Sequence, residues 1–198
     1  MSLLSGRRLL VVDTETTGMS PTVGDRLVEV AYVPIEDGVI REGWSSLVQP
    51  GRSIPEGASR VHGIRAETVV NAPSYAEAAK PLREACADFV LVFHNYPFDL
   101  PFLVEMFREA GLPMLLNPIV DTLGLARLRP KVGSNSLGPL AQRLGITPGT
   151  AHRALTDART TAEVLVKLTA QWEAARPGSS LAEMAAESQD SMRAPHRP

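Results

Sequence analysis

The sequence has a single cysteine, Cys86, among its 198 residues. One thiol excludes an internal disulfide and a zinc site built from several cysteines, and it is typical of a reducing compartment. Long apolar runs are also missing, because no stretch approaches the ~18 residues that a membrane-spanning helix needs. The apolar run that follows Arg7 and Arg8 ends at Asp13, which is too short for the core of a signal peptide. We therefore expect a cytoplasmic protein with no membrane partner.

Net charge is also low, because 20 basic residues face 22 acidic residues and leave a formal charge of −2. Proteins that coat nucleic acid by neutralising phosphates usually carry a basic excess. Any contact with nucleic acid is therefore small or is assisted by cations. An apolar fraction of 44% is enough for one hydrophobic core. We expect a single domain over residues 1–175 and a flexible, Pro/Ser/Ala-rich tail over residues 176–198, with room for one short helix, SLAEMAAES.

Short apolar segments predict the strands, and longer amphipathic segments predict the helices. The expected strands are residues 8–13, 26–36, 39–50 and 89–93, and the segment PIVD that ends at Asp121. The expected helices are residues 75–89, interrupted near the middle by Pro81, and residues 97–111, 136–146 and 153–175. Asp37-Gly38 is a strong hairpin signal between the second and third strands. Hairpins followed by alternating helices and strands predict an α/β fold, in which an antiparallel meander and later parallel strands form one mixed sheet flanked by helices.

Two carboxylates follow the first strand in the segment VVDTETTG. Alternate side chains of a strand point the same way, so Asp13 and Glu15 should lie on one side, about 6.6 Å apart along the chain. Such a pair at the end of an apolar strand needs a counter-charge, and a divalent cation with oxygen ligands supplies it. The alternative interpretation is an exposed strand end with two solvated acids.

Two further segments carry polar groups next to helix starts. Asp99 falls in the first turn of a helix that follows a buried strand, where it either stabilises the helix dipole or reaches the ligand-binding end of the sheet. His152 and Asp157 are five residues apart, so they would point about 140° apart if both were helical. If they act together, His152 must lie on the loop before the helix. Otherwise His152 is a surface or capping residue.

These segments together give the sequence its resemblance to a known family. It resembles the DEDDh group of 3′-to-5′ exonucleases over roughly residues 8–174. The three matching motifs, in the family's order, are Asp13-Thr14-Glu15-Thr16-Thr17-Gly18, His94-Asn95-x-x-Phe98-Asp99 and His152-x-x-x-x-Asp157. The resemblance implies a ribonuclease H-like fold, an exonuclease domain over residues 1–175, and two Mg²⁺ or Mn²⁺ ions. It also implies the metal ligands Asp13, Glu15, Asp99 and Asp157, with His152 as the general base.

The resemblance further points to residues that would bind a single-stranded 3′ end: Thr16, His62, Asn95 and Phe98. Aromatic and imidazole faces stack on unpaired bases without sequence preference. For Phe98 a place in the hydrophobic core is an equally good interpretation. Asn95 either supports the turn before the helix or touches the substrate.

The leading hypothesis is therefore a metal-dependent exonuclease that releases nucleoside 5′-monophosphates from DNA or RNA 3′ ends. One alternative is a proofreading subunit that docks on a DNA polymerase through its tail. Another is a non-catalytic nucleic-acid-binding adaptor on the same fold. The presence of all five motif residues argues against the adaptor.

Overall fold

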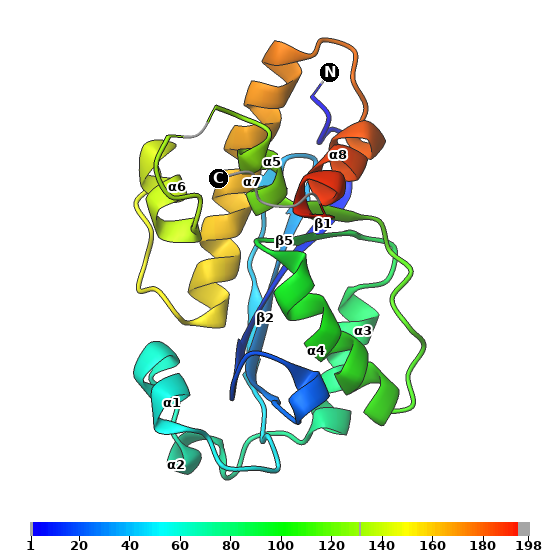
Figure 1. Cartoon of the computed structure of the whole chain (residues 1–198). Coiled ribbons are helices and arrows are strands. Elements are labelled where there is room, and N and C mark those ends of the chain that lie inside the picture. The colour runs from blue at the N-terminus through cyan, green and yellow to red at the C-terminus, as the bar shows by residue number, and fades with distance from the viewer. Residues whose placement is uncertain (1, 131, 194–198) are drawn as a thin grey trace.

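A mixed β-sheet lies between two groups of helices in the computed structural model, which describes residues 2–130 and 132–193 (Figure 1). The strands are β1 (Arg8–Thr16), β2 (Leu27–Glu36), β3 (Val39–Ile40), β4 (Trp44–Leu47), β5 (Val90–Phe93) and β6 (Ile119–Asp121). Their order is β3-β2-β1-β5-β6, and β4 also pairs with β2. The strand β2 is antiparallel to β1, β3 and β4, whereas β5 is parallel to β1 and β6. The expected α/β fold, with a meander followed by parallel strands, is confirmed.

The helices cover both faces of this sheet. They are α1 (Glu56–His62), α2 (Ala66–Val69), α3 (Tyr75–Ala85), α4 (Tyr96–Glu109), α5 (Thr122–Arg127), α6 (Leu137–Arg143), α7 (Ala154–Ala175) and α8 (Leu181–Arg193), with a 3-10 turn, η1 (Pro21–Val23). One core contains residues of α5 to α8, and the other contains residues of α3 and α4. Within residues 2–130 and 132–193, none of these helices combines the length and apolar character that crossing a membrane requires.

The central strand β1 contributes to both cores by simple alternation. Leu9 and Val11 belong to the core under α7, whereas Leu10 and Val12 belong to the core under α4. All four side chains are almost completely buried. Since side chains alternate along a strand, the same alternation continues to the end of β1 and decides which helix each polar residue there faces.

Two expected elements differ in extent. The single strand expected over residues 39–50 is wrong, because the register on β2 shifts by one residue between β3 and β4 and divides the strand in two. A Cβ atom at Gly43 would lie 2.7 Å from a methyl carbon of Leu155 and 2.8 Å from the Tyr32 carbonyl oxygen of β2, so the residue at this shift in register has room only for a glycine. The helix α3 is not interrupted at Pro81 but runs through it and ends at Ala85. Its buried face packs against the sheet, and this packing outweighs the backbone hydrogen bond that proline cannot make.

The segment after Arg176 differs most from the expected flexible tail. The anticipated short helix is present, but α8 is longer and its apolar face is buried, with Met184 fully inaccessible. It covers the edge strand β6, where the Ser188 hydroxyl accepts the N–H of Asp121 at 3.0 Å and the Gln189 amide donates to the carbonyl of Ile119 at 2.9 Å. Residues 181–193 are therefore part of the folded domain. The remainder of the expected tail, residues 194–198, lies outside the described residues.

The packing of α8 predicts a large loss of stability from one substitution. Met184→Ala should lower the free energy of unfolding by about 2–5 kcal/mol, because it leaves a cavity in the core. Asp190→Ala, on the exposed side of the same helix, should change it by less than about 0.5 kcal/mol. Denaturant unfolding of both variants measures the difference. Equal stabilities would contradict the packing of α8 on the sheet.

Candidate functional site

The end of β1 carries the first two site residues. Asp13 and Glu15 lie two positions apart on the strand, on the face that also carries Leu9 and Val11 toward α7. Glu15 is paired in register with Glu29 of β2. The strand thus delivers two carboxylates to one side of the sheet, and a third acid, Glu29, lies beside them.

The turn that follows β1 explains the glycine of the first motif. The Asp25 carboxylate accepts hydrogen bonds from the Thr17 hydroxyl and the Ser20 N–H, each at 3.2 Å. A Cβ atom at Gly18 would lie 2.3 Å from an oxygen of that same carboxylate. Any side chain at Gly18 would displace this carboxylate from its hydrogen bonds, so the glycine preserves the turn that keeps the end of β1 in place.

The start of α7 brings the third motif to β1. Glu15, His152 and Asp157 can each offer one ligand atom, and these atoms lie within 4.8 Å of one another. His152 precedes α7, adopts a positive φ of 62°, and donates its backbone N–H to Asp157 at 2.8 Å. The expected loop position of His152 is confirmed, and it is what allows two residues five apart to meet.

Asp99 joins this group from the opposite layer. It is buried in the first turn of α4, directly after β5, and it accepts a hydrogen bond of 2.6 Å from the Thr14 hydroxyl. Thr14 lies between Asp13 and Glu15 on β1, so its side chain points to the other face of the sheet. The strand β1 therefore contacts both α4, which carries Asp99, and α7, which carries Asp157.

Burial and mutual repulsion raise the pKa values of these acids. Burial raises the pKa of Asp13 well above its usual value, and the charges of Asp99 and Asp157 add to the effect. Burial, followed by the charges of Asp157 and Glu29, raises the pKa of Glu15 to about 8. Burial also raises the pKa of Asp99 to about 7 and raises that of Asp157. Such a cluster binds either protons or cations.

Two of the four expected substrate-binding residues have side chains close to the end of β1. The Thr16 hydroxyl donates to the Gly18 carbonyl at 2.6 Å, so it takes part in the turn. The buried His62 accepts the N–H of Ile64 on Nδ1 at 3.0 Å, whereas its Nε2 has no hydrogen-bond partner among the described residues. Burial lowers the pKa of His62, and the Thr16 carbonyl opposes the shift. The buried Nε2 atom is thus held next to β1, beside the Thr16 carbonyl.

The other two expected residues lie at the start of α4. Asn95 is the residue before the helix and has a positive φ of 85°, and its side chain makes no capping hydrogen bond. Phe98 is partly buried and packs against Phe102, with ring centroids 5.5 Å apart. It therefore belongs to the edge of the core, and one part of its surface stays accessible.

Two buried acids were missed by the sequence analysis. Asp121 is fully buried and accepts the N–H groups of Asn95 at 3.0 Å and Tyr96 at 2.6 Å, and that of Gly124 at 2.7 Å. It fixes the start of α4 to the end of β6. Glu29 is buried beside Glu15. The available signals were an acid before a helix start in PIVDTLG and a lone acid within the apolar strand LVEVAYV.

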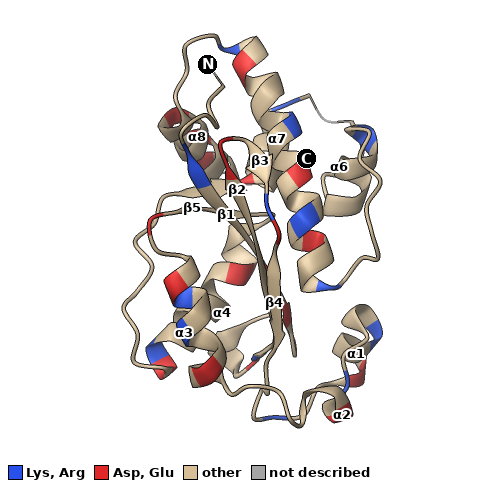
Figure 2. Cartoon of the chain, turned by 180° about the vertical axis from the view of Figure 1, so that it is seen from behind, with Lys and Arg blue, Asp and Glu red and all other residues tan. Residues whose placement is uncertain are grey.

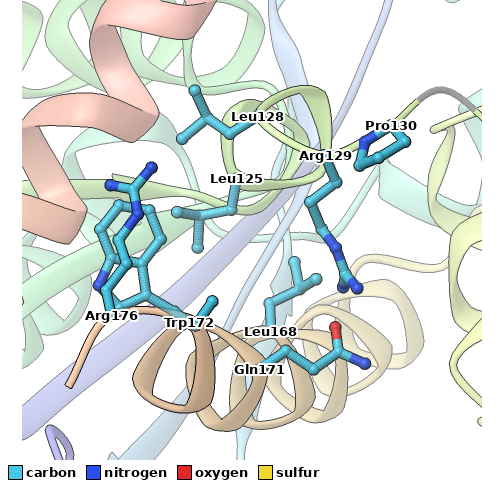
Figure 3. Close-up of a pocket in the computed structure, with 9 residues that line it drawn as sticks. Leu125, Leu128, Arg129, Pro130, Leu168, Gln171, Trp172 and Arg176 are labelled. Atoms are coloured by element: carbon cyan, nitrogen blue, oxygen red, sulfur yellow. The ribbon is translucent and has the colours of Figure 1, made fainter.

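A pocket of about 260 Å³ lies elsewhere, between α5 and α7. Figure 3 shows Leu125, Leu168 and Trp172 at this pocket with Arg129 and Arg176 at its sides, and its lining contains no carboxylate. It is therefore separate from the acidic cluster. Lys and Arg residues are scattered over α1, α3, α6 and α7 and are not gathered on one element (Figure 2). This distribution agrees with the low net charge.

Comparisons with known proteins point to one family. Residues 10–165 match the model of the exonuclease family (RNase T). A DNA polymerase III subunit epsilon-like protein of Rhodobacter capsulatus is 43% identical over 164 residues, which is 80% of this chain and 23% of that protein. DNA polymerase III PolC-type of Bacillus cereus is 35% identical over 84% of this chain and 12% of that protein. The chain thus spans less than a quarter of the length of these relatives.

Solved structures show the same fold. Exonuclease X in complex with 5′-overhanging duplex DNA superposes with a TM-score of 0.72 at 28% identity, and the match covers 91% of this chain and 99% of that chain. Exonuclease I superposes with a TM-score of 0.75 at 21% identity over 83% of this chain and 41% of that chain. The expected ribonuclease H-like fold class is confirmed.

The acidic cluster predicts that the metal-free protein loses stability as the pH rises. The folded state keeps the proton of Glu15 up to a pKa of about 8, whereas the usual value is 4.5. Between these values the folded state binds more protons than the unfolded state, so the free energy of unfolding falls with pH. Each unit of pKa difference corresponds to about 1.4 kcal/mol. Thermal unfolding with chelator at about pH 5 and about pH 8 measures the fall.

A divalent cation and one substitution serve as controls for this prediction. Mn²⁺ should stabilise the protein more at the higher pH, because the cation competes with protons for the carboxylates. Glu15→Gln removes one titrating group and should flatten the pH dependence. The same pH dependence in Glu15→Gln as in the wild type would contradict the assignment.

Proposed function

The chain belongs to the exonuclease family, and on that premise we propose that it hydrolyses phosphodiester bonds at nucleic-acid 3′ ends and releases nucleoside 5′-monophosphates. The observation that carries the proposal is the meeting of Glu15, His152 and Asp157 within 4.8 Å. Asp13 and Asp99 lie close to this group, because the charges of Asp99, Asp157 and Glu15 raise the pKa of Asp13. The charge of Asp99 also raises the pKa of Glu15. Acids from three separate elements thus share one place with a histidine, which a purely structural site does not require.

We propose that Asp13, Glu15, Asp99 and Asp157 hold two divalent cations. These four side chains fit divalent cations, because carboxylate oxygens are the ligands preferred by Mg²⁺ and Mn²⁺. Four carboxylates carry a formal charge of −4, which two such ions neutralise, so that a phosphate enters without net repulsion. When bound, the ions would lower the pKa of water and stabilise charge on the phosphate oxygens.

His152 is proposed to act as the general base. Its side chain is exposed, and one nitrogen of its imidazole ring lies within 4.8 Å of a carboxylate oxygen of Glu15 and of a carboxylate oxygen of Asp157. The ring can therefore accept the proton of an attacking water beside the carboxylates. The hydrogen bond from the His152 backbone to Asp157 restrains the loop, so that the ring stays next to the site.

Thr16, His62, Asn95 and Phe98 are proposed to bind the terminal nucleotides of a single strand. Nδ1 of His62 accepts a backbone N–H, and the lowered pKa keeps the ring neutral near pH 7, so the remaining proton lies on Nε2. This N–H is buried beside the Thr16 carbonyl, so a substrate oxygen or base reaches it only when the surrounding residues move. The accessible part of Phe98 offers a stacking surface. Asn95 and the backbone of Thr16 lie at the ends of β5 and β1, next to the acids.

Association with a DNA polymerase is a second candidate, and the similarity to polymerase III proteins supports it. Docking through α8 is not favoured, because its apolar residues Leu181, Met184 and Ala185 are already buried in the domain. A non-catalytic adaptor is also not favoured, because all five motif residues are present. An adaptor that only binds nucleic acid does not need Glu15, His152 and Asp157 to lie together.

His152→Ala should lower kcat by a factor of about 10² or more, because it removes the proposed proton acceptor. Mn²⁺ affinity, measured by isothermal titration calorimetry, should stay nearly unchanged. Asp157→Asn is the comparison variant and should lose both cleavage and metal affinity. If His152→Ala lost as much Mn²⁺ affinity as Asp157→Asn, His152 would be a ligand rather than the base.

The proposed activity is tested with a panel of oligonucleotides labelled at the 5′ end. Single-stranded and duplex DNA and RNA are incubated with the protein and Mg²⁺ or Mn²⁺, and chelator serves as the control. A ladder that shortens one nucleotide at a time from the 3′ end, with 5′-monophosphate products, is the expected result. Internal cuts, or no cleavage of any substrate with either ion, would contradict the proposal.

A further inference from the structure

Glu29 is a carboxylate beside the acidic cluster that the proposed chemistry does not use. It lies within β2, opposite Glu15, and only 2% of its surface is exposed. A buried carboxylate is unfavourable unless it is paired and hydrogen-bonded. The partners of Glu29 therefore indicate what this residue does.

Among the described residues, all the hydrogen bonds that the Glu29 side chain accepts come from one short segment. Arg153 donates from Nε at 3.2 Å and from Nη2 at 2.8 Å, so its guanidinium grips both carboxylate oxygens. Ala154 donates its backbone N–H to the same carboxylate at 3.0 Å. These partners are 124 and 125 residues away in the sequence. The contact is therefore a product of the fold and not of local structure.

The contact fixes the beginning of α7. Ala154 is the first residue of this helix, and its N–H is one of the helix-terminal donors that have no partner within a helix. The preceding residue, Arg153, provides no side-chain cap. The Glu29 carboxylate of β2 caps this N–H instead. Its bidentate ion pair with Arg153 fixes the orientation of the carboxylate and also strengthens the contact.

The anchored turn carries two proposed site residues. His152 directly precedes Arg153, and Asp157 follows four residues later. The hydrogen bond from the His152 N–H to Asp157 closes the segment on itself, so its two ends move together. Glu29 joins the middle of this closed turn to β2, and the neighbouring residue across the ladder is Glu15.

We propose that Glu29 and Arg153 are positioning residues for the reaction, an inference that rests on the proposed function. Their ion pair holds the first turn of α7 against β2, so that His152 and Asp157 stay beside Glu15. The guanidinium of Arg153 also balances the charge of Glu29. This ion pair, the anchor of α7, therefore adds no net charge next to the acids. A lysine at position 153 could supply the positive charge, but it lacks the planar set of N–H donors that binds both carboxylate oxygens.

The test uses Glu29→Gln and Arg153→Lys in the full chain. Each variant should lower kcat on a single-stranded oligonucleotide by about tenfold or more and weaken Mn²⁺ binding by a similar factor, as expected when a group that orients ligands is lost. KM should change little, because the proposed substrate contacts lie on β1, α1 and α4. Full activity of Arg153→Lys would mean that charge alone suffices and would overturn the proposal.

Glu109→Gln is the control for the loss of a bidentate ion pair at an exposed position, since the Glu109 side chain is 42% exposed and that of Glu29 is 3% exposed. Glu109 is also gripped at both oxygens by an arginine, with Arg26 Nη2 at 2.9 Å from Oε1, but it lies at the end of α4 and not at the α7 turn. This variant should keep the wild-type kcat and Mn²⁺ affinity. Losses equal to those of Glu29→Gln would show that any such ion pair supports activity through general stability, and would reject a specific role.

A readout without catalysis separates this inference from the proposed function. Amide hydrogen exchange of Ala154 in the metal-free protein should become faster in Glu29→Gln and stay unchanged in Glu109→Gln. If the wild type cleaves no oligonucleotide, the proposed function fails, whereas exchange and Mn²⁺ affinity still report on the anchor. If the wild type cleaves and Glu29→Gln matches it in kcat, Mn²⁺ affinity and Ala154 exchange, the anchor alone is rejected.

Discussion

Carboxylates buried side by side repel one another, and the cost of holding them together is the constraint on which the site depends. Burial alone favours the protonated forms of Asp13 and Glu15, and each neighbouring charge adds to that preference. The structure meets this cost with rigid supports, since a strand and the first turns of two helices carry the acids. The site is therefore prepared for cations before any bind, at the expense of stability when they are absent.

The alternation of β1 connects this constraint to the rest of the fold. Its apolar residues enter the two cores in turn, and its last residues continue the same alternation with polar groups. Glu15 thus faces α7, whereas Thr14 faces α4 and donates to Asp99. Strand pairing on both sides of β1 holds this alternation in register. A slip of one residue would exchange the two faces and separate the acids.

Much of the fold could be predicted from the sequence, because the signals are local. Asp37-Gly38 joins two strands as expected, and apolar runs mark β1, β5 and β6. The errors have non-local causes. The shift in register at Gly43 depends on close contacts with Leu155, which is distant in the sequence, and with Tyr32, which lies on β2. The helix α8 is ordered by the uncovered edge of β6, and the composition of residues 176–198 contains no information about that edge.

The sequence by itself determined which chemical groups are present and how they are spaced, because strand alternation and the loop before α7 are local properties. It indicated Asp13, Glu15, Asp99, His152 and Asp157 as candidates. Only the tertiary structure decided that Glu15, His152 and Asp157 meet, that pKa values rise, and that Glu29 and Asp121 support the helices. Coulomb interactions, burial and hydrogen bonds depend on distances in space, and Glu29 lies 125 residues from the helix start that it holds.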